Sequence, residues 1–242
     1  MKEKFIHFNF LDVYVSIRFF DKGLKWYNSA KKLFSGFPSS GNFSGKVVNL
    51  SGDSFLDFRR AYKQAISYII KKKMKSDNLA FIHASAVYDS NKIYIFLGKS
   101  GFGKSTACKI LHQKGFKFIT DDTFILDIRR KKIIVFPKPI ELKKPYKMQK
   151  RFFFYFPMIE SNEVSFVRRK LIFFLLKNKI KTVEHYNSFV KILKSMRWEY
   201  FRKLNHLDGV MDILKSTANL KNLDQKSYMK IIAKRGNDFY VL

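Results

Sequence analysis

The most constraining feature of the 242-residue sequence is a glycine-rich segment that joins an apolar run to an amphipathic run. Residues 98–105 read GKSGFGKS, which fits the Walker A pattern G-x-x-x-x-G-K-[ST]. The preceding run, residues 93–97, has the length of a buried strand. Residues 104–114 have helical periodicity, and Gly115 stands where a C-terminal cap belongs. A strand, a glycine loop and a helix in this order predict a phosphate-binding loop.

Each residue type in this segment has a physical use in binding phosphate. Glycines let the backbone turn so that successive N–H groups point at phosphate oxygens, and the helix start adds unpaired N–H groups and its positive dipole end. We expect Lys104 to reach the β- and γ-phosphates, Ser105 to ligate Mg²⁺, and Thr106 to hydrogen-bond the α-phosphate. The predicted nucleotide-binding residues are Gly98, Lys99, Ser100, Gly101, Phe102, Gly103, Lys104, Ser105 and Thr106.

Two adjacent carboxylates, Asp121 and Asp122, directly follow the short apolar run of residues 116–120. Taken alone, such a pair is typical of a solvated turn at the end of a strand. Its position beside the glycine loop favours a catalytic use, in which one carboxylate holds Mg²⁺ and the other takes a proton from an attacking hydroxyl. Because adjacent carboxylates repel each other, we also expect a metal ion or a cation that keeps both ionised.

One histidine, His83, lies in the apolar run of residues 81–88. Turn-forming residues separate this run from the one that leads into the glycine loop, so the two runs predict a β-hairpin. A single histidine in an apolar strand is usually a packed or hydrogen-bonded residue. The hairpin, however, would bring His83 near the γ-phosphate and Asp121, and we therefore keep it as a candidate catalytic residue.

The rest of the chain gives a coarser prediction. Residues 4–20 alternate as strands do, and residues 55–73 carry apolar side chains at helical spacing. The further predicted elements are a pair of strands at residues 123–126 and 132–135, a core strand at 171–176, and a helix from Phe189 to about Leu204 capped by Ser188.

The formal net charge of +29, from 48 Lys+Arg and 19 Asp+Glu, has two interpretations. A chain of this charge attracts nucleic acid, anionic lipid or an acidic protein. Alternatively, the charge reflects a composition in which Lys, Phe, Ile and Asn are abundant together, with the lysines spread along the chain. No recognition motif of aromatic and basic residues accompanies the charge, so we do not expect a nucleic-acid partner.

The sequence also indicates a compartment. The single cysteine, Cys108, excludes a disulfide framework and a cysteine-based zinc site. The N-terminus has no signal-peptide apolar region, and the longest apolar runs, residues 152–159 and 171–176, are too short for a transmembrane segment. We therefore expect a cytoplasmic protein with no transmembrane segment.

Three segments together resemble the catalytic domain of the bacterial HPr kinase/phosphorylase family and its shorter relatives, the HPr-kinase-related serine kinases. They are residues 82–87 (IHASAV), 98–106 (GKSGFGKST) and 115–122 (GFKFITDD). The resemblance covers about residues 79–140. It implies an α/β fold of the phosphoenolpyruvate-carboxykinase-like P-loop kinase type, with a mixed sheet.

The same resemblance implies a domain organisation and further binding residues. The catalytic domain would span residues 79–242 and follow a small N-terminal α+β lobe, residues 1–78. Residues 136–140 (FPKPI) resemble a proline-containing segment of the short relatives, in which Lys138 would contact phosphate. Members of the family form oligomers, so a homo-oligomer is also implied.

The activity implied by the resemblance is ATP-dependent transfer of the γ-phosphoryl group to a serine hydroxyl, with Mg²⁺. By position, Asp121 is similar to the family's general base and Asp122 to its Mg²⁺-linked aspartate. His83 resembles the histidine that pairs with this machinery, and Lys104 completes the predicted catalytic set.

The chain departs from the family pattern downstream of these segments. A glycine-rich signature with a metal-associated glutamate is not recognisable, and the acids in that region are Glu141, Glu160 and Glu163. The segment tied to phosphorylase activity and HPr docking is not recognisable either. We predict a kinase acting on a hydroxyl, with serine the first choice, of a protein, peptide or small molecule. The alternative is a nucleotide-gated ATP-binding protein that phosphorylates no acceptor.

Overall fold

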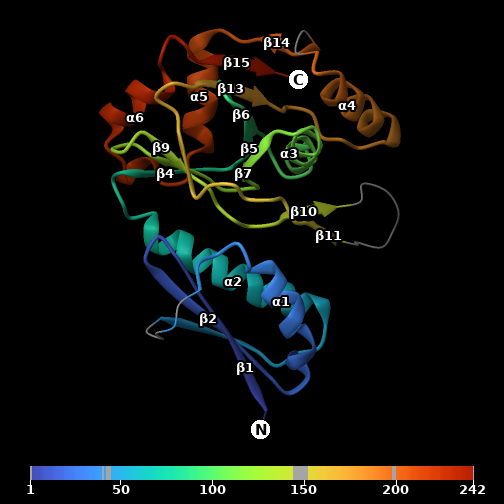
Figure 1. Ribbon diagram of the computed structural model, residues 1–242. Helices are drawn as coiled ribbons and strands as arrows, with labels where there is room; N and C mark the ends of the chain where they lie inside the picture. Colours follow the sequence, from blue (N-terminus) through green and yellow to red (C-terminus); the bar gives the residue numbers. More distant parts are fainter. Residues whose placement is uncertain (1, 40, 42–44, 144–151, 198–199, 242) are drawn as a thin grey trace. The chain divides into compact units, whose positions relative to one another are not determined.

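The computed structural model has helices and mixed β-sheets, which confirms the α/β class (Figure 1). It describes residues 2–39, 41, 45–143, 152–197 and 200–241. The chain divides into two compact units, Met1–Lys75 and Ser76–Leu242. The sequence placed the boundary between residues 78 and 79, just before the first strand of the second unit.

The first unit is built on a three-stranded sheet. β1 (Glu3–Phe10) and β2 (Val13–Phe20) form an antiparallel pair, which confirms the strands predicted for residues 4–20. β3 (Lys46–Leu50) lies parallel to β2 on its other side. The buried apolar residues of β2 alternate along the strand, and Ser16 between them is buried as well; the apolar residues are Val13, Val15, Ile17 and Phe19.

Three helical segments complete the first unit. α2 (Phe55–Lys73) has the bounds that its apolar spacing predicts, and its N-cap Ser54 accepts a hydrogen bond from the N–H of Asp57 at 3.1 Å. η1 (Asp21–Trp26) and α1 (Tyr27–Leu33) follow β2 and were not predicted.

A six-stranded sheet forms the centre of the second unit. Its strands are β5 (Ala84–Tyr88), β6 (Lys92–Leu97), β7 (Lys117–Thr120), β13 (Lys170–Leu175), β14 (Arg202–Lys203) and β15 (Asp238–Val241). The order is β14-β15-β13-β6-β5-β7, in which β6, β13 and β15 are parallel and β5 is antiparallel to both of its neighbours. The predicted hairpin leading into the glycine loop is β5–β6, and the predicted core strand is β13.

Two smaller sheets flank the central one. The bounds of their strands are β4 (Leu79–Ile82), β8 (Phe124–Asp127), β9 (Lys132–Ile134), β10 (Ile140–Lys143), β11 (Phe152–Tyr155) and β12 (Glu163–Ser165). Four of them form an antiparallel sheet in the order β12-β9-β8-β4, and β10 pairs with β11. The pair predicted for residues 123–126 and 132–135 is β8 and β9.

Helices cover both faces of the central sheet (Figure 1). They are α3 (Lys104–Gln113), α4 (Val183–Ser195), α5 (His206–Ser216) and α6 (Gln225–Ile232), with a short η3 (Leu220–Asn222) between the last two. Phe96 and Phe174 pack toward α3 and α4, whereas their strand neighbours Ile95 and Phe173 pack toward α5 and α6. β6 and β13 are therefore apolar on both faces, which explains their continuous apolar runs in the sequence.

The helix predicted to start after Ser188 is misplaced. α4 starts at Val183, because the hydroxyl of Thr182 accepts a hydrogen bond from the N–H of His185 at 3.2 Å and caps the helix. It ends at Ser195, where Met196 adopts a φ of +57°. Residues 198–199 of the predicted helix lie outside the described residues.

The strand predicted for residues 81–88 is interrupted. β4 ends at Ile82 and β5 starts at Ala84, and the two strands belong to different sheets. His83 lies at the bend between them, and its N–H donates to the carbonyl of Ser216 at 3.0 Å. The prediction that His83 is a strand residue is therefore wrong.

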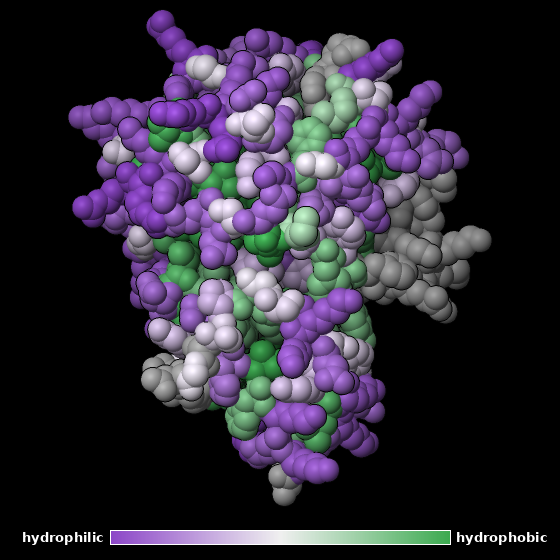
Figure 2. All heavy atoms as spheres, in the orientation of Figure 1, coloured by the Kyte–Doolittle hydropathy of each residue, from purple (hydrophilic) through white to green (hydrophobic). Residues whose placement is uncertain are grey.

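None of the helices in the described ranges combines the length and the apolar character that crossing a membrane requires. On the face shown in Figure 2, hydrophilic side chains predominate and apolar ones form small patches between them.

Candidate functional site

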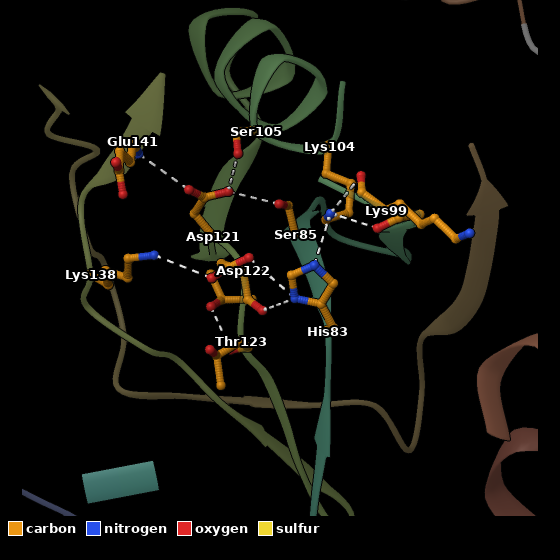
Figure 3. Close-up of polar contacts among 12 residues, drawn as sticks. His83, Ser85, Lys99, Lys104, Ser105, Asp121, Asp122, Thr123, Lys138 and Glu141 are labelled. Atoms are coloured by element: carbon orange, nitrogen blue, oxygen red, sulfur yellow. Dashed lines mark hydrogen bonds and ion pairs between the residues drawn. The ribbon is translucent and has the colours of Figure 1, made fainter. Parts of the chain in front are cut away.

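The candidate site lies where β6 ends and the chain passes through residues 98–103, the glycine loop, into α3 (Figure 3). Gly103 shows why the loop needs glycine: its φ is +98°, and a Cβ there would lie 2.7 Å from Phe189 Cε1. A side chain at this position would therefore be strained and would also collide with α4. The close approach of α4 fixes the path of the backbone at the start of α3.

The N-terminus of α3 faces this loop. Gly103 is the N-cap residue and, having no side chain, makes no cap hydrogen bond. The first turn of a helix has N–H groups without intrahelical partners and carries the positive end of the helix dipole. The loop and the helix start together offer a place for an anion.

The Lys104 side chain folds back over the glycine loop and is 6% exposed. Its ammonium donates to the carbonyls of Gly98 at 2.6 Å and Lys99 at 3.3 Å, and it lies 3.1 Å from Nε2 of His83. The side chain of Lys99, in contrast, points away from the cluster (Figure 3). The ammonium of Lys104 is thus the cation at the centre of the site.

The ring of His83 connects Lys104 with Asp122. Its Nδ1 lies 3.1 Å from the carbonyl oxygen of Asp122 and 3.2 Å from Oδ1 of the same residue. Because an ammonium only donates, Nε2 of His83 must accept from Lys104, and the ring proton then sits on Nδ1 and is donated to Asp122. The sequence placed His83 near Asp121, and the structure places it beside Asp122.

Asp121 is buried, with 1% of its surface exposed, and is held by three donors. Its Oδ1 accepts from the hydroxyls of Ser85 and Ser105, both at 2.8 Å, and its Oδ2 accepts from the N–H of Glu141 at 3.2 Å. Burial raises the pKa of the Asp121 carboxyl above its usual range, against the opposing effects of Lys138 and the two hydroxyls. This carboxylate faces Ser105 and not the solvent.

Asp122 has a different environment, although it is the next residue. Its side chain is half-exposed, its φ is +77°, and its Oδ2 lies 3.6 Å from Nζ of Lys138. Desolvation alone would raise the pKa of Asp122, but the electrostatic effects of Lys138, His83 and Lys104 outweigh it and hold the pKa below its usual value. A cation, Lys138, thus lies beside Asp122, whereas the pKa of Asp121 remains raised.

Two contributors to the site were not predicted from the sequence. Ser85 is fully buried in β5 and donates to Asp121, and the N–H of Glu141 at the start of β10 donates to the same carboxylate. The signal for Ser85 is a hydroxyl inside an otherwise apolar buried strand, which needs a polar partner. The signal for Glu141 is only its position after residues 136–140.

The other acids of the downstream region lie elsewhere. Glu160 pairs with Lys117, and Glu163 pairs with Arg130 and Lys132 on the small four-stranded sheet. Of the three acids named from the sequence, only Glu141 contacts the candidate site among the described contacts, and it does so through its backbone N–H.

The other residues predicted to bind nucleotide differ in exposure. Ser100 is exposed at the tip of the loop, and Thr106 is half-buried in the first turn of α3. Phe102 is half-buried against the apolar cluster beneath α3 and α4.

A metal ion would find few ligands from the protein alone, because the described residues contain no group of three or more His, Cys, Asp and Glu that could hold one. Mg²⁺ is usually held by one or two protein oxygens together with substrate phosphates and water. Ser105 Oγ and Asp121 Oδ1, 2.8 Å apart, are a donor set of that kind. The residues present therefore fit Mg²⁺ that arrives with a phosphate ligand.

Comparison of the chain with protein-family models gives no match, and a search of curated proteins gives no significant one. The interpretation of the site therefore depends on its own residues and geometry.

We predict that Gly103→Ala destabilises the fold more than Gly115→Ala does. Gly115 has a similar φ of +93°, but a Cβ there would meet no atom within 4 Å. The backbone term is about 1–2 kcal/mol in both variants, and Gly103→Ala adds about 1–3 kcal/mol for the collision with Phe189. Urea denaturation measures the free energy of unfolding of both variants. Equal losses of unfolding free energy in the two variants would show that the approach of α4 does not constrain the loop.

We also predict a pH-dependent effect of Asp122→Asn on stability. Because the folded-state pKa of Asp122 is lowered, its charge stabilises the fold above the usual aspartate pKa, and this contribution is lost as the pH falls through the lowered value. The variant should be less stable than the wild type at pH 7, by less than about 1 kcal/mol because the Asp122 side chain is half-exposed. The difference should close as the pH falls from above the usual aspartate pKa of about 4 through the lowered value.

Urea denaturation at several pH values, without metal or nucleotide, measures this difference. Asparagine tolerates positive φ, so the variant changes the charge and not the backbone. Asp12→Asn, at another exposed residue with positive φ (+58°), is the control. A difference of the same size at pH 7 and pH 2 would mean that the charge of Asp122 is not responsible.

Proposed function

We propose that this chain is an ATP-dependent kinase that transfers the γ-phosphoryl group to a hydroxyl, with a serine of a protein or peptide as the first candidate acceptor. The observation that carries the proposal is the convergence of Lys104, Ser105, Asp121 and Asp122 on one side of the glycine loop. A buried cation, a hydroxyl and two carboxylates with different environments are the groups that phosphoryl transfer uses.

Nucleotide phosphates are assigned to the glycine loop and the start of α3. Lys104 already lies over the loop, so its ammonium can exchange the carbonyls of Gly98 and Lys99 for phosphate oxygens with a small movement. The N–H groups at the α3 N-terminus would donate to the same phosphates. Bound Mg²⁺ would neutralise part of the phosphate charge, held by Ser105 and Asp121.

The contacts favour a division of roles between the two carboxylates. Asp121 is buried against Ser105, which suits a carboxylate on the metal side. Asp122 is half-exposed, ionised at neutral pH and held by His83 and Lys138, so an acceptor hydroxyl could reach it. We therefore propose Asp122 as the general base. This reverses the roles implied by the resemblance to HPr kinase/phosphorylase, and one experiment distinguishes the two assignments.

In the proposed reaction the acceptor oxygen bonds to the γ-phosphorus and gives its proton to Asp122. The bond from the γ-phosphorus to the bridging oxygen breaks, and ADP leaves with the electron pair. His83 holds the Asp122 carboxylate in place through its Nδ1–H. Lys104 stabilises the charge that develops on the transferring group, which is the main contribution of a protein to a loose transition state.

The experiment that tests the proposal is single-turnover incubation of the purified chain with γ-labelled ATP and Mg²⁺, with and without a cell extract. We expect label on a discrete acceptor, and a loss of at least about 100-fold in rate for Asp122→Asn with nucleotide binding retained. Lys104→Ala should lose nucleotide binding, and Asp121→Asn should weaken it only when Mg²⁺ is present. Lys109→Ala, an exchange on the outer part of α3, is the control.

Other outcomes separate the alternatives. Transfer lost in Asp121→Asn but kept in Asp122→Asn would restore the assignment made from the sequence. ATP binding with no labelled acceptor and no effect of either aspartate would favour a nucleotide-gated binding protein. Absence of nucleotide binding would rule out the proposal as a whole.

A further inference from the structure

A pocket lies in the Ser76–Leu242 unit, away from the glycine loop. It has a volume of about 530 Å³ and is lined by the residue before β4, the turn between β8 and β9, the segment that leads into β13, and α6 with the turn that follows it. In the β4–β8 pair, Leu79 lies opposite Asp127 at the pocket end and Ile82 lies opposite Phe124 at the other. The length of these strands, about 10 Å, therefore separates the pocket from His83 and Asp122.

Positive charge dominates the lining of this pocket. Five of its 14 residues are cationic and one is acidic, a higher ratio than the 48 to 19 of the whole chain. The cations are Arg129, Lys131, Arg169, Lys230 and Lys234. The one acid, Asp224, is engaged as the N-cap of α6, where its carboxylate accepts from the N–H of Ser227 at 3.2 Å. The charge of the pocket is thus largely uncompensated.

Arg169 is a pre-positioned anchor within the pocket. Its Nε donates to the carbonyl of Asp89 at 3.3 Å, one NH donates to the carbonyl of Ser165 at 2.7 Å, and the guanidinium lies over the ring of Tyr88 at 5.5 Å. A guanidinium has five N–H donors, so further donors remain for a ligand. Because the side chain is already fixed, binding would cost little additional conformational entropy.

The other four cations are held by no acid. Arg129, Lys131, Lys230 and Lys234 form no ion pair within the described ranges, and all four are exposed around the pocket. Such side chains can close on an anionic ligand without first breaking an internal pair.

The wall between the cations is apolar. Ile128, Phe166 and Leu171 line it and are buried in the core of the unit, and Ile231 adds a half-buried side chain from α6. A pocket with a cationic rim and an apolar wall matches a ligand with both kinds of surface.

We propose that this pocket binds a small organic anion whose charged group contacts Arg129, Arg169 and Lys230 and whose apolar body lies against Phe166 and Leu171. This proposal is independent of the proposed kinase function, since it uses different residues at the other end of the strands.

A fluorescence titration of the full chain with 1-naphthyl phosphate tests this proposal. We expect saturable binding that weakens as ionic strength rises. Inorganic phosphate, which has no apolar body, and 1-naphthol, which has no anionic group, should each bind at least tenfold more weakly. Arg129→Ala and Lys230→Ala should each weaken binding of 1-naphthyl phosphate about tenfold. Both side chains are exposed, and far-UV circular dichroism confirms that the variants remain folded.

Two matched variants locate the bound molecule. Lys226→Ala removes a lysine from the same helix outside the pocket and should leave binding unchanged. Lys104→Ala removes the cation of the glycine loop and should also leave it unchanged. Absence of saturable binding, equal weakening in Lys226→Ala, or loss in Lys104→Ala with Arg129→Ala and Lys230→Ala unaffected would overturn the proposal.

Discussion

The arrangement of the candidate site depends on the burial of one ammonium group. Lys104 is 6% exposed, and a buried cation is stable only when its donors are satisfied. The carbonyls of Gly98 and Lys99 therefore turn toward it, which shapes the loop, and His83 must accept with Nε2. That requirement fixes the ring proton on Nδ1 and ties His83 to Asp122. One buried charge thus orders the loop, the histidine tautomer and a carboxylate.

The two neighbouring carboxylates show how strongly position decides chemistry. Asp121 points into the protein and meets hydroxyls and an N–H, whereas the positive φ of Asp122 turns its side chain toward Lys138 and His83. Burial raises the pKa of Asp121, and nearby cations lower the pKa of Asp122. Groups whose pKa values are pushed apart are suited to different roles, which is why we assign them separately.

Elements with local signals could be predicted from the sequence. α2, the β5–β6 hairpin and the loop leading into α3 follow from periodicity, turn residues and glycines within a few positions of each other. The break at His83 could not be predicted, because the partners of the backbone there are distant in the sequence. The N–H of His83 donates to the carbonyl of Ser216, and the side chain of Asn219 bonds to the backbone of β4. The polar residues His83 and Ser85 alternate with apolar ones as in a continuous strand, so the sequence itself gives no sign of the break.

The distinction between local signals and contacts of distant residues applies to the candidate functional residues as well. The glycine loop and the carboxylate pair lie within a short stretch of sequence, so a motif indicates them. The contact of Ser85 with Asp121 and the pocket beside α6 could not be predicted, because each depends on segments that are distant in the sequence. The structure also refines the interpretation of the net charge: most cations lie at the surface, but Lys104 and Lys138 are buried beside the candidate site and five others surround one pocket. At these two places the cations lie next to groups that can orient a ligand, which a general positive field does not do by itself.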